Sequence, residues 1–157
     1  MKIREASIND LKELQELYYE TIININCKDY NADQIAAWAS TANRTKSLAK
    51  KIKDQYFYVA EKDHEIIVGF ASLENSGYLD MMYVHKNFQN MGIAKALLDK
   101  IIEKAKALSL SEIITNASIT AKVFFEKNGF QTVKEQTVFI NAIGLTNYKM
   151  KRGITYN

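Results

Sequence analysis

The hydrophobic pattern of the chain changes its period between Tyr78 and Leu108. Residues 78–84 carry aromatic, β-branched and Met side chains over the length of a strand. From Gly92 onward apolar residues recur at helical spacing, at positions 94, 97, 98, 101, 102, 105 and 108. We therefore predict a strand that leads through a loop into a helix beginning at Gly92. Because the first N–H groups of a helix lack intrahelical acceptors and lie at the positive end of its dipole, this start is a candidate anion site.

The same patterns predict the other elements. Helices are expected near 9–25, from 31 through Trp38 with Asn31 as a capping residue, at 45–53 and at 120–127. Further strands are expected at 2–6, 56–61, 65–73, 112–117, 130–140 and 145–152. Since a helix separates strands 78–84 and 112–117, these two are expected to be parallel neighbours. The predicted fold class is α+β, with a mixed, mostly antiparallel central sheet of about seven strands flanked by helices.

Composition narrows the class of protein. The 157 residues are 47% hydrophobic, which suits one domain spanning 1–157. No apolar run reaches the ~18 residues of a membrane span, and no hydrophobic segment of signal-peptide length opens the chain, so we expect a cytoplasmic protein without a membrane partner. Cys27 is the only cysteine and is expected to be buried, and with two histidines the chain offers no metal site. The net charge of +3 is too small to indicate nucleic acid.

Two segments carry a resemblance to a known family. QNMGIA at 89–94 matches the Gln/Arg-x-x-Gly-x-Gly/Ala pattern of the GNAT superfamily of N-acetyltransferases, and AKVFFEKNGF at 121–130 is similar to that family's A-x-x-F-Y-E-K-x-G-F segment. YYETI at 18–22, residues 29–38 and ASITAK at 117–122 resemble a bacterial subgroup of small, single-domain members. The resemblance implies a GNAT-like (acyl-CoA N-acyltransferase) fold with a splayed parallel central strand pair. It also implies acetyl-CoA as cofactor and direct acetyl transfer to a primary amine of a small molecule or peptide.

The resemblance also implies which residues hold coenzyme A. The backbone N–H groups of 89–94 would bind its pyrophosphate, with Gly92 allowing close approach. The β-strand backbone at 82–84 would hydrogen-bond the pantetheine arm as an added strand does, and the N–H of Met82 would stabilise the thioester oxygen. The full expected set is Met82, Tyr83, Val84, Gln89, Asn90, Met91, Gly92, Ile93, Ala94, Asn116, Ser118 and Phe125.

The catalytic and acceptor residues are less directly indicated. Side chains alternate along a strand, so Tyr78, Asp80, Met82 and Val84 are expected to share one face near the thioester. We predict that Asp80 is the general base, directly or through a water, and that Tyr78 makes a positioning hydrogen bond. The alternative is that Asp80 is a structural carboxylate that pairs with a neighbouring strand. By resemblance the amine approaches an aromatic-rich region of the N-terminal helices, whose expected members are Tyr18, Thr21, Tyr30 and Trp38.

Phe125 departs from the family pattern, because many members have at this position a Tyr whose hydroxyl can protonate the departing thiolate. Leaving a Cys-like thiol of pKa ~8.5 unprotonated at pH 7 costs at most about 2 kcal/mol, whereas deprotonating a Lys-like amine costs about 4.6 kcal/mol. The base therefore matters more than the acid. Two rival functions stay open, a catalytically silent acyl-CoA-binding module and a nucleotide-phosphate-binding protein. The sequence also leaves the oligomeric state open, a homodimer included.

Overall fold

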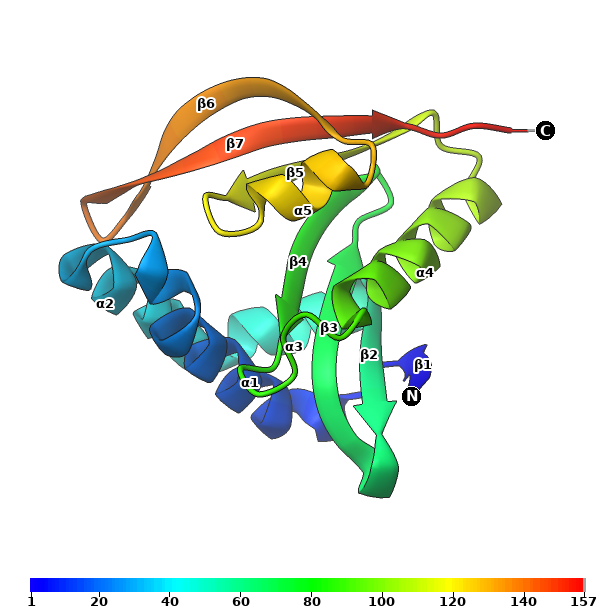
Figure 1. The fold of residues 1–157 in the computed structure, drawn as a ribbon. Coiled ribbons are helices and arrows are strands. Elements are labelled where there is room, and N and C mark those ends of the chain that lie inside the picture. The colour runs from blue at the N-terminus through cyan, green and yellow to red at the C-terminus, as the bar shows by residue number, and fades with distance from the viewer. Residues whose placement is uncertain (157) are drawn as a thin grey trace.

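The computed structural model describes residues 1–156 and contains one seven-stranded sheet (Figure 1). The strands run in the order β1-β2-β3-β4-β5-β7-β6, and every neighbouring pair is antiparallel except β4 and β5. The strands are β1 (Lys2–Glu5), β2 (Tyr56–Lys62), β3 (Ile66–Leu73), β4 (Tyr78–Val84), β5 (Glu112–Ser118), β6 (Gln131–Ile140) and β7 (Ile143–Gly153). The predicted class, strand number and parallel pair are confirmed.

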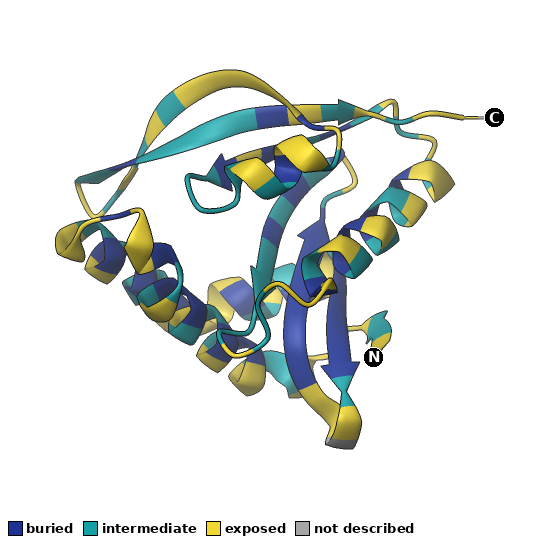
Figure 2. Ribbon diagram, viewed as in Figure 1, coloured by how far each residue is buried: buried dark blue, intermediate teal, exposed yellow. Residues whose placement is uncertain are grey.

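Helices cover both faces of the sheet. They are α1 (Leu11–Asn24), α2 (Ala32–Ser40), α3 (Thr45–Asp54), α4 (Ile93–Ala107) and α5 (Lys122–Lys127), with short 3-10 turns that include η1 (Ile8–Asp10) and η2 (Asn26–Lys28). The core under α4 and α5 includes Leu97, Leu98 and Phe125, and the core under α1 and α3 includes Leu14 and Phe70. Figure 2 shows β3 buried along nearly its whole length, whereas β6 is mostly exposed. None of the described helices is long and apolar enough to cross a membrane.

Local sequence explains where these helices begin and end. Asn31 caps α2 through its Oδ1, which accepts from the Gln34 N–H at 2.9 Å, and the Gln34 side chain accepts the Asn31 N–H in return. The predicted helix at 9–25 is slightly shorter, because its first turn is the 3-10 helix η1. After α5, Gly129 adopts a left-handed φ of 87°, the conformation that commonly ends a helix.

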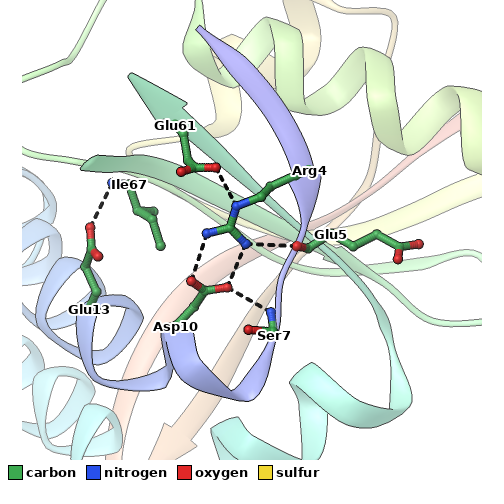
Figure 3. A network of polar contacts seen from close by, with 7 residues as sticks. All are labelled: Arg4, Glu5, Ser7, Asp10, Glu13, Glu61 and Ile67. Atoms are coloured by element: carbon green, nitrogen blue, oxygen red, sulfur yellow. Dashed lines mark hydrogen bonds and ion pairs between the residues drawn. The ribbon is translucent and has the colours of Figure 1, made fainter. Parts of the chain in front are cut away.

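A polar network joins the first strand to the rest of the domain (Figure 3). The Arg4 guanidinium pairs with Glu61 of β2 and makes two hydrogen bonds of 2.9 Å to the Asp10 carboxylate. Asp10 also accepts the Ser7 N–H, and the Arg4 hydrogen bond holds the pKa of Asp10 below its usual value. The network fixes the entry of the chain into α1, which carries residues of the site described below.

The parallel strands β4 and β5 diverge after a short contact. Their pairing covers only Tyr78 with Ile114 and Leu79 with Thr115. At that point the buried Thr115 hydroxyl donates to the Leu79 carbonyl at 2.9 Å. Beyond it the two strands separate, as Figure 1 shows, so residues 80–84 of β4 have no strand partner on the β5 side.

Candidate active site

A cavity of about 520 Å³ lies at the divergence of β4 and β5. It is bounded by β4, the loop and helix start at 88–95, β5, the start of α5, and parts of α1 and α2. Every residue expected to bind coenzyme A lines this cavity: Met82, Tyr83, Val84, Gln89, Asn90, Met91, Gly92, Ile93, Ala94, Asn116, Ser118 and Phe125. The fold thus brings Met82 and Phe125, which are forty-three positions apart in the chain, to the same cavity.

The backbone of β4 presents free polar groups to this cavity. The His85 N–H donates to the Val68 carbonyl of β3 at 2.8 Å. Since successive residues of a strand direct their N–H and C=O groups to opposite sides, those of Met82 and Val84 face away from β3, towards β5. The Val84 carbonyl is engaged there by the Thr21 hydroxyl at 3.0 Å and the Gln89 amide at 2.7 Å. The N–H groups of Met82 and Val84 are left to pair with a molecule in the cavity.

The loop before α4 has the conformation of an anion-binding turn. Gly92 caps the helix with φ at 80°, and Asn90 is also left-handed at 59°. The N–H groups of Ile93, Ala94 and Lys95 are in the first turn of α4 and have no intrahelical acceptor. A Cβ placed on Gly92 would meet no atom within 4 Å, so the glycine is needed here for its φ rather than for internal space.

A β-bulge changes which side chains of β4 share a face. Leu73 pairs with Leu79 but Ser72 pairs with Met81, so Asp80 is an extra residue in β4. Met82 and Val84 pack against the core under α4, whereas Asp80 points to the opposite face and contacts α3. The expectation that Asp80 shares a face with Met82 and Val84 is therefore wrong, because strict alternation does not survive an inserted residue.

Asp80 nevertheless lines the cavity, from the face covered by α1 and α3. Its Oδ2 lies 2.9 Å from Lys51 Nζ and accepts a hydrogen bond of 2.9 Å from the Gln55 amide. Asp80 therefore has a structural partner, as the alternative requires, but the partner is a lysine of α3 and not a residue of a neighbouring strand. The pair is partly exposed, with 34% of the Lys51 side chain and 15% of the Asp80 side chain accessible.

Tyr78 lies outside the cavity lining but is linked to it. Its hydroxyl accepts a hydrogen bond of 3.1 Å from the Asn116 amide, and the Asn116 Oδ1 accepts one of 2.9 Å from Gln136 of β6. Burial, and secondly the nearby Asp80 carboxylate, raise the pKa of Tyr78. Its hydroxyl therefore stays protonated at neutral pH, which suits a hydrogen-bond donor and not a base.

The four expected acceptor residues separate into two pairs. Thr21 and Trp38 line the cavity, whereas Tyr18 and Tyr30 do not. The Tyr30 hydroxyl donates to the Thr146 carbonyl at 2.7 Å and accepts the Ile119 N–H at 2.9 Å, so it joins the helical segment to β7 and to the chain after β5. The Tyr18 ring packs at 4.7 Å against that of Tyr83, which itself lines the cavity.

Other lining residues were not expected from the sequence. They are Ile25, Asn26, Leu79, Phe88, Lys95, Thr115, Thr120 and Ala121. Phe124, which by resemblance matches a position that lines the cofactor, lines the cavity as well. Thr115 had a signal, since it is a polar residue at a buried position of an otherwise apolar strand face. Ile25 and Asn26 had none, because they follow the end of a helix and reach the site only through its packing. Cys27, expected to be buried, is exposed, and Phe130 is in the core.

Comparison with known proteins identifies the family. The family model described as the acetyltransferase (GNAT) domain matches residues 26–152. The uncharacterised N-acetyltransferase YafP of Escherichia coli K12 is 32% identical over 96% of this chain and 95% of its own length. A GCN5-related N-acetyltransferase from Rhodopseudomonas palustris superposes with a TM-score of 0.93 at 28% identity, covering 97% of this chain and 94% of that one.

A more distant structure shares the fold. The PaiA N-acetyltransferase of Thermoplasma acidophilum, solved in complex with coenzyme A, superposes with a TM-score of 0.80 at 22% identity and covers 97% of this chain and 98% of that one. The resemblance read from the 89–94 and 121–130 segments is therefore confirmed by independent comparisons over nearly the whole chain. The chain belongs to the GNAT superfamily of N-acetyltransferases.

Proposed function

We propose that this protein transfers an acetyl group from acetyl-CoA directly to a primary amine of a small molecule or peptide. The observation that carries the proposal is the divergence of β4 and β5, which opens one cavity to both faces of the sheet. One face presents the α4 start, and the other presents Asp80, Thr21 and Trp38. Two reactants can therefore meet at the β4 backbone from opposite sides.

The residues present fit coenzyme A. The first turn of α4 offers backbone N–H groups to a pyrophosphate, and Met82 and Val84 offer strand hydrogen bonds to an amide chain. Thr120 also lines the cavity, and its buried hydroxyl has no hydrogen-bond partner among the described residues. Bound acetyl-CoA supplies the acetyl group as an activated thioester. The Met82 N–H would donate to the thioester oxygen and stabilise the charge that develops on it.

Asp80 is proposed as the group that removes the proton from the amine, directly or through a water. At pH 7 an amine like Lys is protonated, and removing that proton costs about 4.6 kcal/mol, so a positioned base is the most valuable group in the site. The Lys51 ammonium at 2.9 Å holds Asp80 in a fixed place at the cavity wall. Tyr78 is proposed to position Asn116 at the mouth of the strand divergence through their 3.1 Å hydrogen bond.

Phe125 favours a specific rival, the catalytically silent acyl-CoA-binding module. Its ring is 97% buried against Phe124 and Phe130, so it supplies packing to the cavity wall and no proton. The missing acid is worth at most about 2 kcal/mol, which lowers the rate without abolishing it. The magnitude therefore favours an active enzyme.

Acetyl transfer to a panel of primary amines, with calorimetry of coenzyme A, ATP and NAD binding, tests the proposal. We expect tight binding of coenzyme A, no tight binding of ATP or NAD, and turnover with at least one amine. Tight coenzyme binding without turnover of any amine would establish the silent module, and preferential binding of ATP or NAD would establish a nucleotide-binding protein.

Two substitutions test the assignment of the base. Asp80→Asn is expected to lower kcat/KM for the amine about 10²-fold. Tyr78→Phe tests the positioning role separately, because it removes the hydroxyl that accepts the Asn116 hydrogen bond and leaves the Asp80 charge in place. An Asp80→Asn enzyme within about threefold of the parent rate would mean that Asp80 is only structural.

A further inference from the structure

The acceptor half of the cavity is the part reached from the α1 and α2 side. Its wall consists of Thr21 from α1, Ile25 directly after that helix, Asn26 from η2, Trp38 from α2, and Tyr83 from β4. The Trp38 ring lies 6.5 Å from that of Tyr83 and 5.3 Å from that of Tyr30, with edge-to-face geometry in both cases. The wall is therefore a rigid aromatic and aliphatic surface, suited to an apolar body.

Charge is nearly absent from this wall. Among the described lining residues, only Asp80 and Lys95 carry a charge at neutral pH. Asp80 is paired with Lys51, and Lys95 lies at the start of α4, where it pairs with Asp99 at 2.6 Å. A carboxylate or a second ammonium on the acceptor would lose its hydration on binding and would meet no unpaired opposite charge in the wall. Moving such a group out of water is unfavourable.

One polar atom of the wall has no partner. The Oδ1 atom of Asn26 is buried and accepts no hydrogen bond from the described residues, and only 6% of this residue is exposed. Because Asn26 itself lines the cavity, a turn of its carboxamide would bring this unpaired oxygen within reach of a ligand donor, and pairing a buried acceptor is favourable. The neighbouring Thr21 hydroxyl does not serve, because it already donates to the Val84 carbonyl at 3.0 Å.

We propose that Asn26 determines acceptor specificity, and that the acceptor is a monoamine whose remaining body is uncharged and carries one hydroxyl or amide N–H for the Asn26 carboxamide. The proposal rests on the function proposed above and adds the class of acceptor. Free amino acids and polyamines are disfavoured because the wall lacks an unpaired charge to meet their second charged group, and the apolar body packs on Trp38 and Ile25. The hydrogen bond to Asn26 selects among the remaining amines.

A matched series of substrates tests the acceptor class. The probes are n-alkylamines of four to eight carbons that end in a methyl group, a hydroxyl, a carboxylate or a second ammonium. At the preferred length we expect the hydroxyl compound to exceed each charged compound by about tenfold or more in kcat/KM, which corresponds to about 1.4 kcal/mol. If a diamine or an amino acid is used as well as the hydroxyl compound, the acceptor class is wrong while the acetyltransferase function stands. If no amine of any kind is acetylated, the proposed function fails and this inference fails with it.

Two variants test the residue itself. Asn26→Leu keeps the side-chain size and is expected to reduce the preference for the hydroxyl over the methyl compound to about one, with the acetyl-CoA KM unchanged. Asn26→Asp adds a carboxylate at the same place and is expected to shift the ratio of diamine to methyl compound about tenfold towards the diamine. Both readouts are ratios for one enzyme preparation, so a lowered folded fraction does not affect them. An unaltered hydroxyl preference in Asn26→Leu would overturn the role of Asn26.

Discussion

Gly92→Ala separates the two roles of this glycine, which are backbone conformation and ligand approach. In the folded protein the new Cβ meets no atom within 4 Å, so the only cost of folding is the left-handed φ of 80°. A non-glycine residue in this region costs about 1–2 kcal/mol. For a domain of this size that corresponds to a fall in Tm of roughly 2–8 °C. The methyl group would also stand where the pyrophosphate approaches the helix start.

Gly129→Ala is the matched control. Gly129 has a similar φ of 87°, and the nearest atom to its added Cβ is 3.6 Å away on the Arg152 side chain, an ordinary contact. Both variants should therefore lose similar stability, as measured by thermal unfolding. Only Gly92→Ala should weaken coenzyme A binding in calorimetry, by about tenfold or more if one charge-assisted hydrogen bond of about 1.5–3 kcal/mol is lost. Equal coenzyme affinity in the two variants would refute the assignment of the α4 start as the phosphate site.

Three further predictions concern other parts of the molecule. Asp10→Asn should lower Tm at pH 7. Because Arg4 lowers the folded-state pKa of Asp10, the stabilisation is present above the ordinary value of 3.8 and is lost as the pH falls below it. The unfolding curves of parent and variant should therefore converge at acidic pH. Thr115→Val should destabilise by about 0.5–1.5 kcal/mol in denaturant unfolding by removing the hydrogen bond from the Thr115 hydroxyl to the Leu79 carbonyl, with Thr115→Ser restoring most of the loss. Trp38→Ala should raise the amine KM while the acetyl-CoA KM stays constant, and the reverse pattern would place Trp38 in the coenzyme site.

The sequence predicted the fold well because local rules and global topology agree in this chain. The change of period at Gly92, the capping pair Asn31 and Gln34, and the helix between two strands each determined an element or a pairing, and the structure contains them all. The residues expected to bind coenzyme A were indicated by the family resemblance, since most lie in one continuous segment with a recognisable spacing, and all of them line the cavity.

The acceptor side was predicted less completely because it depends on packing between distant segments. The bulge that turns Asp80 away from Met82 arises from the register of β3 against β4, which no pattern within 78–84 records. The Lys51 partner of Asp80 lies on α3, a helix with several lysines, and nothing in the sequence distinguishes the one that contacts the site. Asn26 enters the cavity wall only because α1 ends where it does against β4.

The divergence of β4 from β5 also creates an unpaired strand edge inside the domain. Edges on a protein surface invite intermolecular pairing and aggregation, but this one borders the cavity inside the domain, where the pantetheine arm of coenzyme A is proposed to bind. In the proposed complex, the pantetheine arm would complete this edge as an added strand does. By mass action, coenzyme at a hundred times its Kd would add about 2.7 kcal/mol of resistance to unfolding. The lifetime of this protein in a cell should therefore follow the supply of coenzyme A, shortening when the coenzyme is scarce.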